Sequence, residues 1–112
     1  MSFWKTLDSE AQLDELRQAS FVRPQLIFKH SVTCGISAQA HANLEEAIAD
    51  LNEHVELHYL DLLRYRSVSN AIASKFGVPH QSPQAILIRN GEVVYHASHF
   101  SINPGKIVRS AA

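Results

Sequence analysis

The only cysteine of the chain lies in the segment HSVTCGIS, residues 30–37, and a serine follows it three positions later. Two cysteines at this spacing ahead of a helix are typical of a dithiol redox motif. Here Cys34 stands alone and Ser37 occupies the second position. A lone thiol cannot form an internal disulfide, but its thiolate can attack a mixed disulfide and take up the small-thiol half. The segment therefore favours monothiol exchange chemistry.

The residues around Cys34 favour a reactive thiolate. A helix that begins directly after Cys34 contributes a partial positive charge and unpaired N–H groups, both of which stabilise the thiolate. Lys29 and His30 can add positive charge, and Ser37 can donate a hydrogen bond to the sulfur. Gly35 leaves room for a partner disulfide to approach. The opposing interpretation is a small, buried and inert side chain, as many free cysteines are.

The spacing of apolar residues predicts the elements that position this segment. Apolar runs and two-residue alternation indicate strands, and apolar residues three or four positions apart indicate helices. We expect strands in QLIFKH (25–30), VELHYLDL (55–62), AILI (85–88) and EVVYH (92–96). We expect helices from the segment TLDSEAQ to Pro24, from Ile36 to Leu51, over residues 67–76 before Gly77, and after Asn103 and Pro104. The dipeptide Asn-Gly at 90–91 predicts a tight hairpin between the last two strands.

This order of elements predicts one α/β domain over residues 1–112. A helical crossover makes the first two strands parallel, and the hairpin makes the last two antiparallel. A four-stranded mixed sheet with helices on both faces satisfies both conditions, and this is the thioredoxin-like fold. In such folds a cis-proline stands opposite the active sulfur, and Pro83 in HQSPQ is the candidate. The backbone of Ser82 is then expected to pair with an extended substrate.

Composition excludes several classes of function. The chain has 112 residues, a formal net charge of −1 and 46% hydrophobic residues, so one core is feasible and nothing indicates nucleic-acid binding. Charges interrupt the N-terminal region, and no apolar run approaches the roughly 20 residues of a membrane span. One unpaired cysteine argues against a secreted disulfide framework. We therefore expect a cytoplasmic protein with neither a signal peptide nor a membrane contact.

Four segments together resemble one family: HSVTCGIS, RSVSNAIASKFGV, HQSPQ and VVYHASH. In this order they are similar to the YtxJ family, the monothiol bacilliredoxin-like proteins of the bacillithiol system. The resemblance covers about residues 13–107. It implies a bacterial thioredoxin-fold oxidoreductase that removes bacillithiol from S-bacillithiolated cytosolic proteins. These proteins are the implied partners, bacillithiol is the co-substrate, and no tightly bound cofactor is expected.

The same resemblance assigns residues to the site. Cys34 matches the active cysteine of the family and Pro83 its cis-proline, and Arg66, Ser69, Asn70, Ser98 and His99 match further motif positions. Because bacillithiol carries a malate group, cations are expected near the sulfur, and Arg66 and His80 are the candidates. The candidate catalytic residues are Cys34 and Ser37. The candidate residues for binding the thiol or the substrate are His30, Thr33, Gly35, Arg66, Asn70, His80, Ser82, Pro83 and Gln84.

Two residues of this set have structural alternatives. Arg66 can instead be a solvated charge or a helix cap, and Asn70 can instead bond a backbone group. Gly35 also departs from the proline that family members often carry after the cysteine.

The segment CGIS also resembles the CGFS motif of monothiol glutaredoxins, so an iron–sulfur-cluster-binding protein is the alternative. That family carries a Gly-Gly-Asp turn for glutathione, where this chain has HASHFSINPGK, and a proline where this chain has Thr33. A thioredoxin-fold adaptor without catalysis is the third hypothesis. The seven histidines show no zinc spacing with Cys34, and we expect His54, His58 and His96 at solvent-facing or edge positions.

Overall fold

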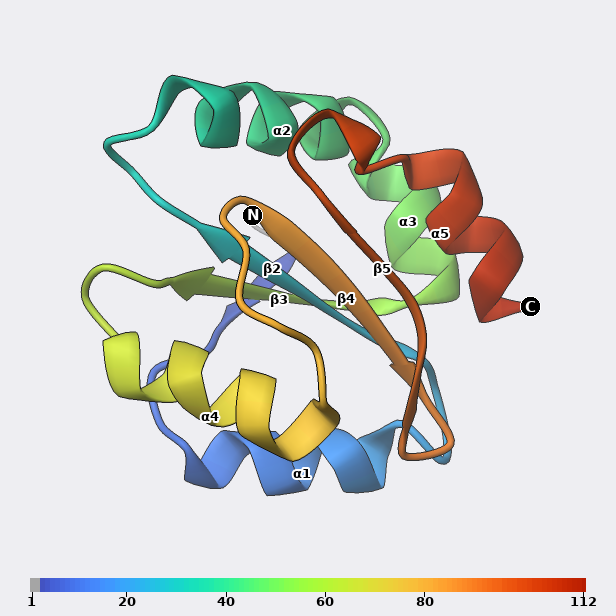
Figure 1. The fold of residues 1–112 in the computed structure, drawn as a ribbon. Coiled ribbons are helices and arrows are strands. Elements are labelled where there is room, and N and C mark those ends of the chain that lie inside the picture. The colour runs from blue at the N-terminus through green and yellow to red at the C-terminus, as the bar shows by residue number, and fades with distance from the viewer. Residues whose placement is uncertain (1–2) are drawn as a thin grey trace.

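The computed structural model describes residues 3–112 and is organised around a five-stranded mixed sheet (Figure 1). The strands are β1 (Trp4–Thr6), β2 (Gln25–His30), β3 (Glu56–Asp61), β4 (Gln84–Arg89) and β5 (Glu92–Ser98). Their spatial order is β1-β3-β2-β4-β5. Strands β1, β3 and β2 run parallel, whereas β4 is antiparallel to β2 and β5 is antiparallel to β4. The predicted thioredoxin-like fold is confirmed, with one strand more than expected.

The additional strand changes the environment of its neighbour. Because β1 pairs with β3, the β3 strand lies inside the sheet, and His58 is only 8% exposed. The expectation of a solvent-facing or edge position for His58 is therefore wrong. Its Nε2 atom lies 2.6 Å from Gln25 Oε1, an acceptor, so His58 donates this hydrogen bond. Burial lowers the pKa of His58 to about 4.

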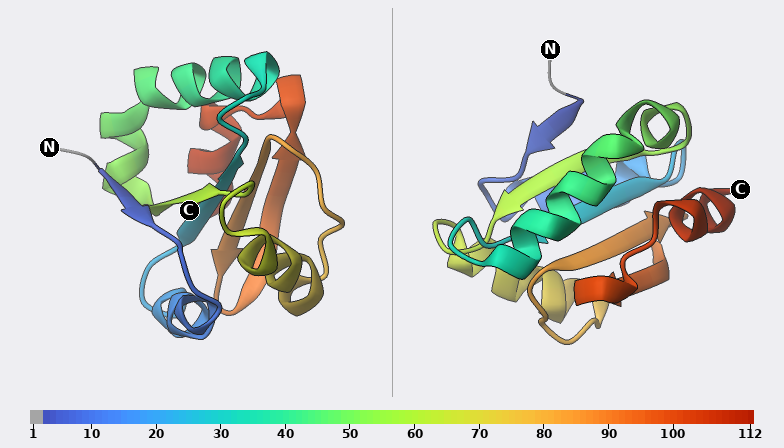
Figure 2. Two further views of the ribbon diagram at one scale, coloured as in Figure 1. Left: turned by 90° about the vertical axis from the view of Figure 1, so that its left-hand side faces the viewer. Right: turned by 90° about the horizontal axis from the view of Figure 1, so that it is seen from above.

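Helices cover both faces of the sheet (Figures 1 and 2). The helices are α1 (Ala11–Ala19), α2 (Gly35–Glu46), α3 (Ile48–His54), α4 (Arg66–Phe76) and α5 (Pro104–Ala111), with a short 3-10 helix, η1, at His99–Ser101. The single helix expected from Ile36 to Leu51 is divided at Ala47, whose φ of −104° and ψ of 12° interrupt the α-helical backbone. The apolar period continues through the break, because Leu44 and Leu51 enter the same core cluster.

The predicted turn and cap residues adopt the expected conformations. Gly77 ends α4 in the left-handed region at φ +69°. Asn90 and Gly91 both have positive φ, 53° and 79°, as a tight hairpin between β4 and β5 requires. The Asn103 side chain caps α5 by accepting from the Lys106 N–H at 3.1 Å.

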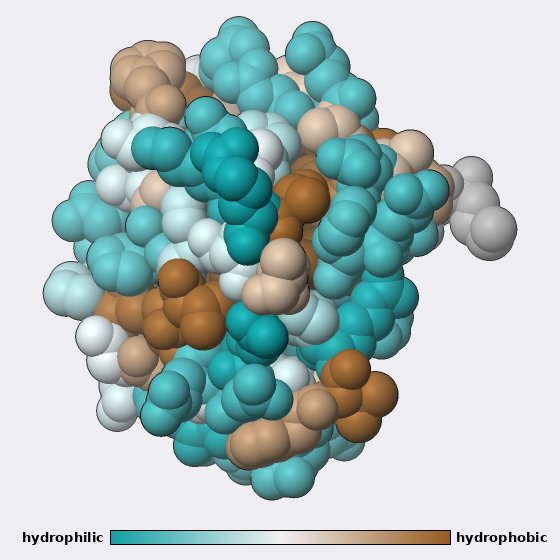
Figure 3. Space-filling model, turned by 90° about the vertical axis from the view of Figure 1, so that its right-hand side faces the viewer, coloured by the Kyte–Doolittle hydropathy of each residue, from teal (hydrophilic) through white to brown (hydrophobic). Residues whose placement is uncertain are grey.

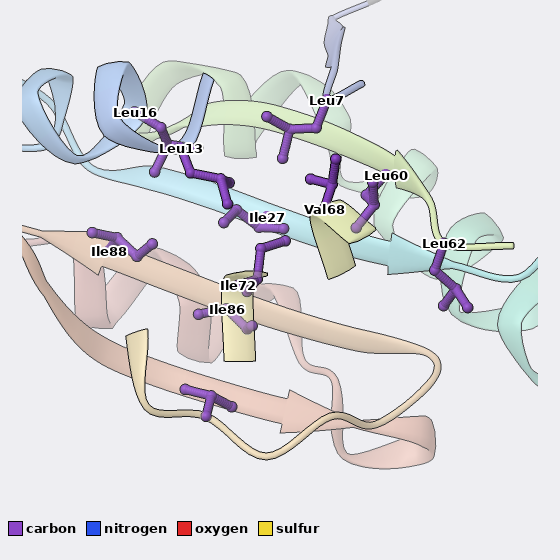
Figure 4. Close-up of a cluster of buried hydrophobic side chains, with 11 residues drawn as sticks. Leu7, Leu13, Leu16, Ile27, Leu60, Leu62, Val68, Ile72, Ile86 and Ile88 are labelled. Atoms are coloured by element: carbon purple, nitrogen blue, oxygen red, sulfur yellow. The ribbon is translucent and has the colours of Figure 1, made fainter. Parts of the chain in front are cut away.

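Two apolar clusters lie on opposite faces of the sheet. One packs α1 and α4 against the sheet through residues such as Leu13, Ile27 and Ile72 (Figure 4). The other packs α2, α3 and α5 against it through Phe28 and Leu44, among others. This division follows from strand geometry, since successive side chains of β2 point to opposite faces.

The surface carries separated apolar patches between hydrophilic side chains on the face drawn in Figure 3. Within residues 3–112, none of the helices is long and apolar enough to cross a membrane.

Candidate functional site

Cys34 occupies the junction between β2 and α2, as the sequence predicted. It is the N-cap of α2, with an extended backbone at φ −106° and ψ 124°. Its N–H donates to the Ser31 carbonyl at 3.1 Å, and its carbonyl accepts from the Ala38 N–H at 3.0 Å. The thiol is free and half-buried. The first N–H groups of an α-helix have no partner within the helix, so α2 directs its positive end to this residue.

The backbone beside the thiol is open. A Cβ added at Gly35 would meet no atom within 4 Å, so the room expected at this position is present. Thr33, on the other side of Cys34, is exposed, and its Oγ1 lies 3.4 Å from Ser31 Oγ. A partner disulfide can therefore approach Cys34 from the side of solvent.

Ser37 is buried and holds the loop before Cys34 in place. Its Oγ accepts from the Ser31 N–H at 3.0 Å and lies 2.7 Å from His30 Nδ1. A hydroxyl carries a single proton, and a proton shared with His30 is not available to another acceptor. The expected hydrogen bond from Ser37 to the Cys34 sulfur stays a prediction. The contacts that the structure provides connect Ser37 to Ser31 and His30, and they stabilise the loop that leads to Cys34.

His30 lies on the face of the sheet covered by α2, within an aromatic cluster. Its ring centroid is 5.6 Å from that of Phe28, 5.1 Å from His41 and 5.4 Å from Tyr59. Burial in this cluster, together with the nearby His41, lowers the pKa of His30. A lowered pKa disfavours the protonated ring, so it argues against the positive charge expected of His30 near Cys34.

The loop that carries Pro83 reaches the same end of the sheet as Cys34. Lys29 is paired with Gln84 across β2 and β4, so the loop before Gln84 lies beside the residues that lead into Cys34. The Ser82–Pro83 peptide bond is cis, as expected for this position, and Pro83 is buried. The Pro83 carbonyl accepts from the His99 N–H at 3.1 Å.

The backbone of Ser82 is available to a ligand. Ser82 is half-buried, and among the residues described by the structure none bonds to its N–H or carbonyl. This backbone is free to pair with an extended peptide or thiol, and the pairing expected from the sequence stays a prediction.

The side chain of Gln84 is engaged within its own loop, so its expected contact with a ligand stays a prediction. It is buried, its Nε2 donates to the Pro79 carbonyl at 3.1 Å, and its Oε1 accepts from the Gln81 N–H at 3.4 Å. Both ends of the amide thus stabilise the loop itself. A groove of about 410 Å³ lies beside this loop and does not include Cys34 in its lining. The groove is lined by Pro79, Gln81, Gln84, His96, Ala97, Ser98 and Ser101.

The structure also brings together a cluster of basic residues on the face of the sheet covered by α4. Lys29 Nζ donates to the Ser69 carbonyl at 3.2 Å and lies 3.3 Å from His80 Nδ1. The pKa of His80 is lowered, mainly by burial and then by the positive charges of Lys29 and Arg66. Arg66 and Asn70 lie in α4 with exposed side chains, so their expected contacts with a ligand stay predictions.

Sequence reasoning placed Lys29 near the sulfur and overlooked its role in this cluster. Its side chain instead contacts α4 and His80, on the face opposite to His30. The available signal was a lysine inside the otherwise apolar strand LIFK, because a buried lysine requires specific partners.

Comparisons with known proteins agree with this geometry. The family model described as monothiol bacilliredoxin BrxC matches residues 5–107. A solved structure described as having a thioredoxin fold shares 29% identity with the chain at a TM-score of 0.84, and the match covers 98% of this chain and 95% of that one.

Thioredoxins of known structure share the fold at lower identity. The thioredoxin of Malassezia sympodialis (Mala s 13) has 15% identity and a TM-score of 0.75, with 99% of this chain and 92% of its own covered. The thioredoxin of Fasciola hepatica has 20% identity and a TM-score of 0.71, with 96% and 95% covered.

Proposed function

Because the chain belongs to the monothiol bacilliredoxin family, we propose that it removes bacillithiol from S-bacillithiolated proteins by thiol–disulfide exchange at Cys34. The observation that carries the proposal is the free, half-buried Cys34 at the N-terminus of α2, at the same end of the sheet as the Pro83 loop. The family and the fold support redox activity, and the identity of the small thiol is the finer part of the proposal.

The proposed reaction begins with attack of the Cys34 thiolate on the bacillithiol sulfur of the mixed disulfide. The S–S bond to the protein breaks, the protein leaves as a thiolate that takes up a proton, and a new S–S bond joins Cys34 to bacillithiol. One disulfide is consumed and one is formed, so this step needs no external oxidant or reductant. A second low-molecular-weight thiol then attacks this bond and releases Cys34, and bacillithiol leaves as a small disulfide.

The surrounding residues have distinct parts in this proposal. The N-terminus of α2 stabilises the thiolate, and the backbone of Ser82 pairs with the substrate chain. Arg66 and His80 attract the carboxylates of the malate group. The partners are bacillithiolated proteins and bacillithiol itself, a co-substrate rather than a tightly bound cofactor. We place the reaction in the cytoplasm, where thiols are kept reduced.

The test uses a bacillithiolated model protein, and intact mass spectrometry follows both the substrate and the chain. We expect the wild-type chain to gain the mass of bacillithiol while the substrate loses it. The substitution Cys34→Ser should abolish the transfer, and Ser67→Ala, an exposed serine in α4, should leave it unchanged. Full transfer by the Cys34→Ser variant, or no transfer by the wild-type chain, would overturn the proposal.

A further inference from the structure

Lys29 is a fully buried lysine whose ammonium contacts α4 and His80. Its relative exposure is 0%, and burial lowers its pKa to about 8. Among residues 3–112, its partners are the Ser69 carbonyl and His80 Nδ1, and no carboxylate forms an ion pair with it. An ammonium group buried without a carboxylate is costly, so an apolar side chain would serve packing better at this position.

The direction of the hydrogen bond between Lys29 and His80 follows from the chemistry of the ammonium. Below pH of about 8, Lys29 carries three donors and no acceptor. His80 Nδ1, 3.3 Å away, must therefore be the acceptor, and the proton of the neutral ring is on Nε2. Ser69 Oγ also lies 3.3 Å from Nδ1 and can only donate to the same lone pair. His80 is an exposed residue, so its Nε2–H remains for a ligand.

The charges that face His80 all have the same sign. Lys29 from β2 and Arg66 from α4 both act on its ring, and within the part of the chain that the structure describes no carboxylate is among the causes of its lowered pKa. Ser69, the remaining group in contact, is neutral. The cluster therefore combines net positive charge with an oriented N–H donor, which is the complement of a carboxylate.

We propose that Lys29 is a positioning residue that fixes His80 as the Nε2–H tautomer, so that His80 and Arg66 together recognise a carboxylate of the small-thiol substrate. This inference rests on the proposed function for its substrate and on the Lys29–His80 contact for its mechanism. Lys29 acts through His80, and its own ammonium stays inside the core. The substrate class is an anionic disulfide that carries carboxylates.

A spectroscopic experiment tests the tautomer without any substrate. Proton–nitrogen NMR of the histidine rings at pH 7, with the His80 signals assigned through His80→Gln, should show the proton on Nε2 in the wild-type chain. In Lys29→Met, we expect a mixture of tautomers and a raised pKa of His80, because the donor and the positive charge are both lost. Lys29→Gln keeps an N–H donor without the charge, so it should retain the tautomer and still raise the pKa of His80.

Lys75→Met is the matched control. Lys75 lies in the last turn of α4 and pairs with Asp14, so it should leave the signals of His80 unchanged. A proton on Nδ1 in the wild-type chain, or the same tautomer and pKa of His80 in Lys29→Met, would overturn the inference.

A kinetic experiment tests the substrate class. The rate at which Cys34 is capped is measured at increasing concentrations of glutathione disulfide, which carries carboxylates, and of neutral hydroxyethyl disulfide. Here KM is the half-saturating disulfide concentration and kcat the maximal rate of this single capping step, in which Cys34 joins one half of the disulfide and the other half leaves as a thiol. In Lys29→Met we expect KM for glutathione disulfide to rise about tenfold, equivalent to about 1.4 kcal/mol, with kcat nearly unchanged. For hydroxyethyl disulfide we expect less than about a twofold change in either constant, since no charged contact is lost.

The two proposals fail in different ways. Equal losses with both disulfides would show that Lys29 has only a structural role. A wild-type chain that takes no bacillithiol from the bacillithiolated model protein would contradict the proposed function, while the NMR result would still decide whether Lys29 fixes the tautomer of His80.

Discussion

At the scale of single residues, Ser37 shows how the position of a second redox cysteine can serve packing. Its buried hydroxyl accepts from the Ser31 N–H and contacts His30, so it satisfies two polar groups of the loop that carries Cys34. Ser37→Ala leaves these groups without a partner and should lower the free energy of unfolding by about 1–3 kcal/mol. Urea unfolding measures the loss. The exposed Ser67→Ala should change stability by less than about 0.5 kcal/mol, and an equal loss at both positions would contradict the role of Ser37.

His58 predicts a pH dependence of stability. Its pKa is about 4 in the folded chain against an ordinary value of 6.5, so the unfolded chain binds a proton first as the pH falls. The stability linked to His58 is complete above pH 6.5 and decreases as the pH falls to about 4, by up to about 3 kcal/mol. His30 and His80 act in the same direction, because their pKa values are also lowered.

The measurement is the urea midpoint between pH 7 and pH 4. His58→Gln should flatten the dependence, whereas His96→Gln, an exposed residue on β5, should keep the wild-type slope. Parallel curves for His58→Gln and the wild-type chain would show that His58 does not govern this range.

The sequence predicted residues with a local signature better than residues defined by their neighbours. Cys34 and Pro83 were found because each lies in a short pattern next to an apolar strand. The roles of Lys29 and His58 depend on which strand or helix packs against them, and the sequence around each residue does not indicate that neighbour. Ser37 was placed at the site correctly, but its contacts with Ser31 and His30 needed the three-dimensional structure.

At the scale of elements, two glycines at element ends predict opposite responses to one substitution. Gly35 begins α2, and a Cβ there meets nothing within 4 Å, so Gly35→Ala should stabilise the chain by about 0.4–1 kcal/mol through the unfolded state. Gly91 has φ +79° in the hairpin, and a Cβ there meets the Phe21 ring at 2.9 Å. Gly91→Ala should cost about 1–2 kcal/mol or more. Thermal unfolding compares the two variants, and equal effects would contradict the assigned backbone conformations.

Element boundaries show the same limit of local patterns. Apolar periods and turn residues predicted β2, α4, the hairpin and the cap of α5, because each carries its own signal. The strand β1 has only three residues, too few for an alternation, and it forms because the edge of β3 is there to pair with. The break at Ala47 was likewise not predicted, since the apolar period runs through it from Leu44 to Leu51.

At the scale of the whole molecule, one sheet couples two separate cores. The α1 and α4 cluster and the α2, α3 and α5 cluster share the same strands, so neither face can unfold without exposing the other. We therefore expect a single cooperative transition, as is usual for small domains. Trp4, the only tryptophan, lies on β1 and packs near Phe28, whereas Leu13 belongs to the opposite cluster.

This arrangement gives a direct test of cooperativity. Leu13→Ala should lower the free energy of unfolding by about 2–5 kcal/mol. Although Leu13 lies across the sheet from Trp4, the urea midpoint seen by Trp4 fluorescence should fall as far as the midpoint seen by circular dichroism. Leu63→Ala, at a residue that is 43% exposed, is the matched control and should move neither midpoint appreciably. A fluorescence midpoint unaffected by Leu13→Ala would mean that the two faces unfold independently. The lost stability of the α1 and α4 cluster would then not affect the side of the sheet on which Trp4 lies.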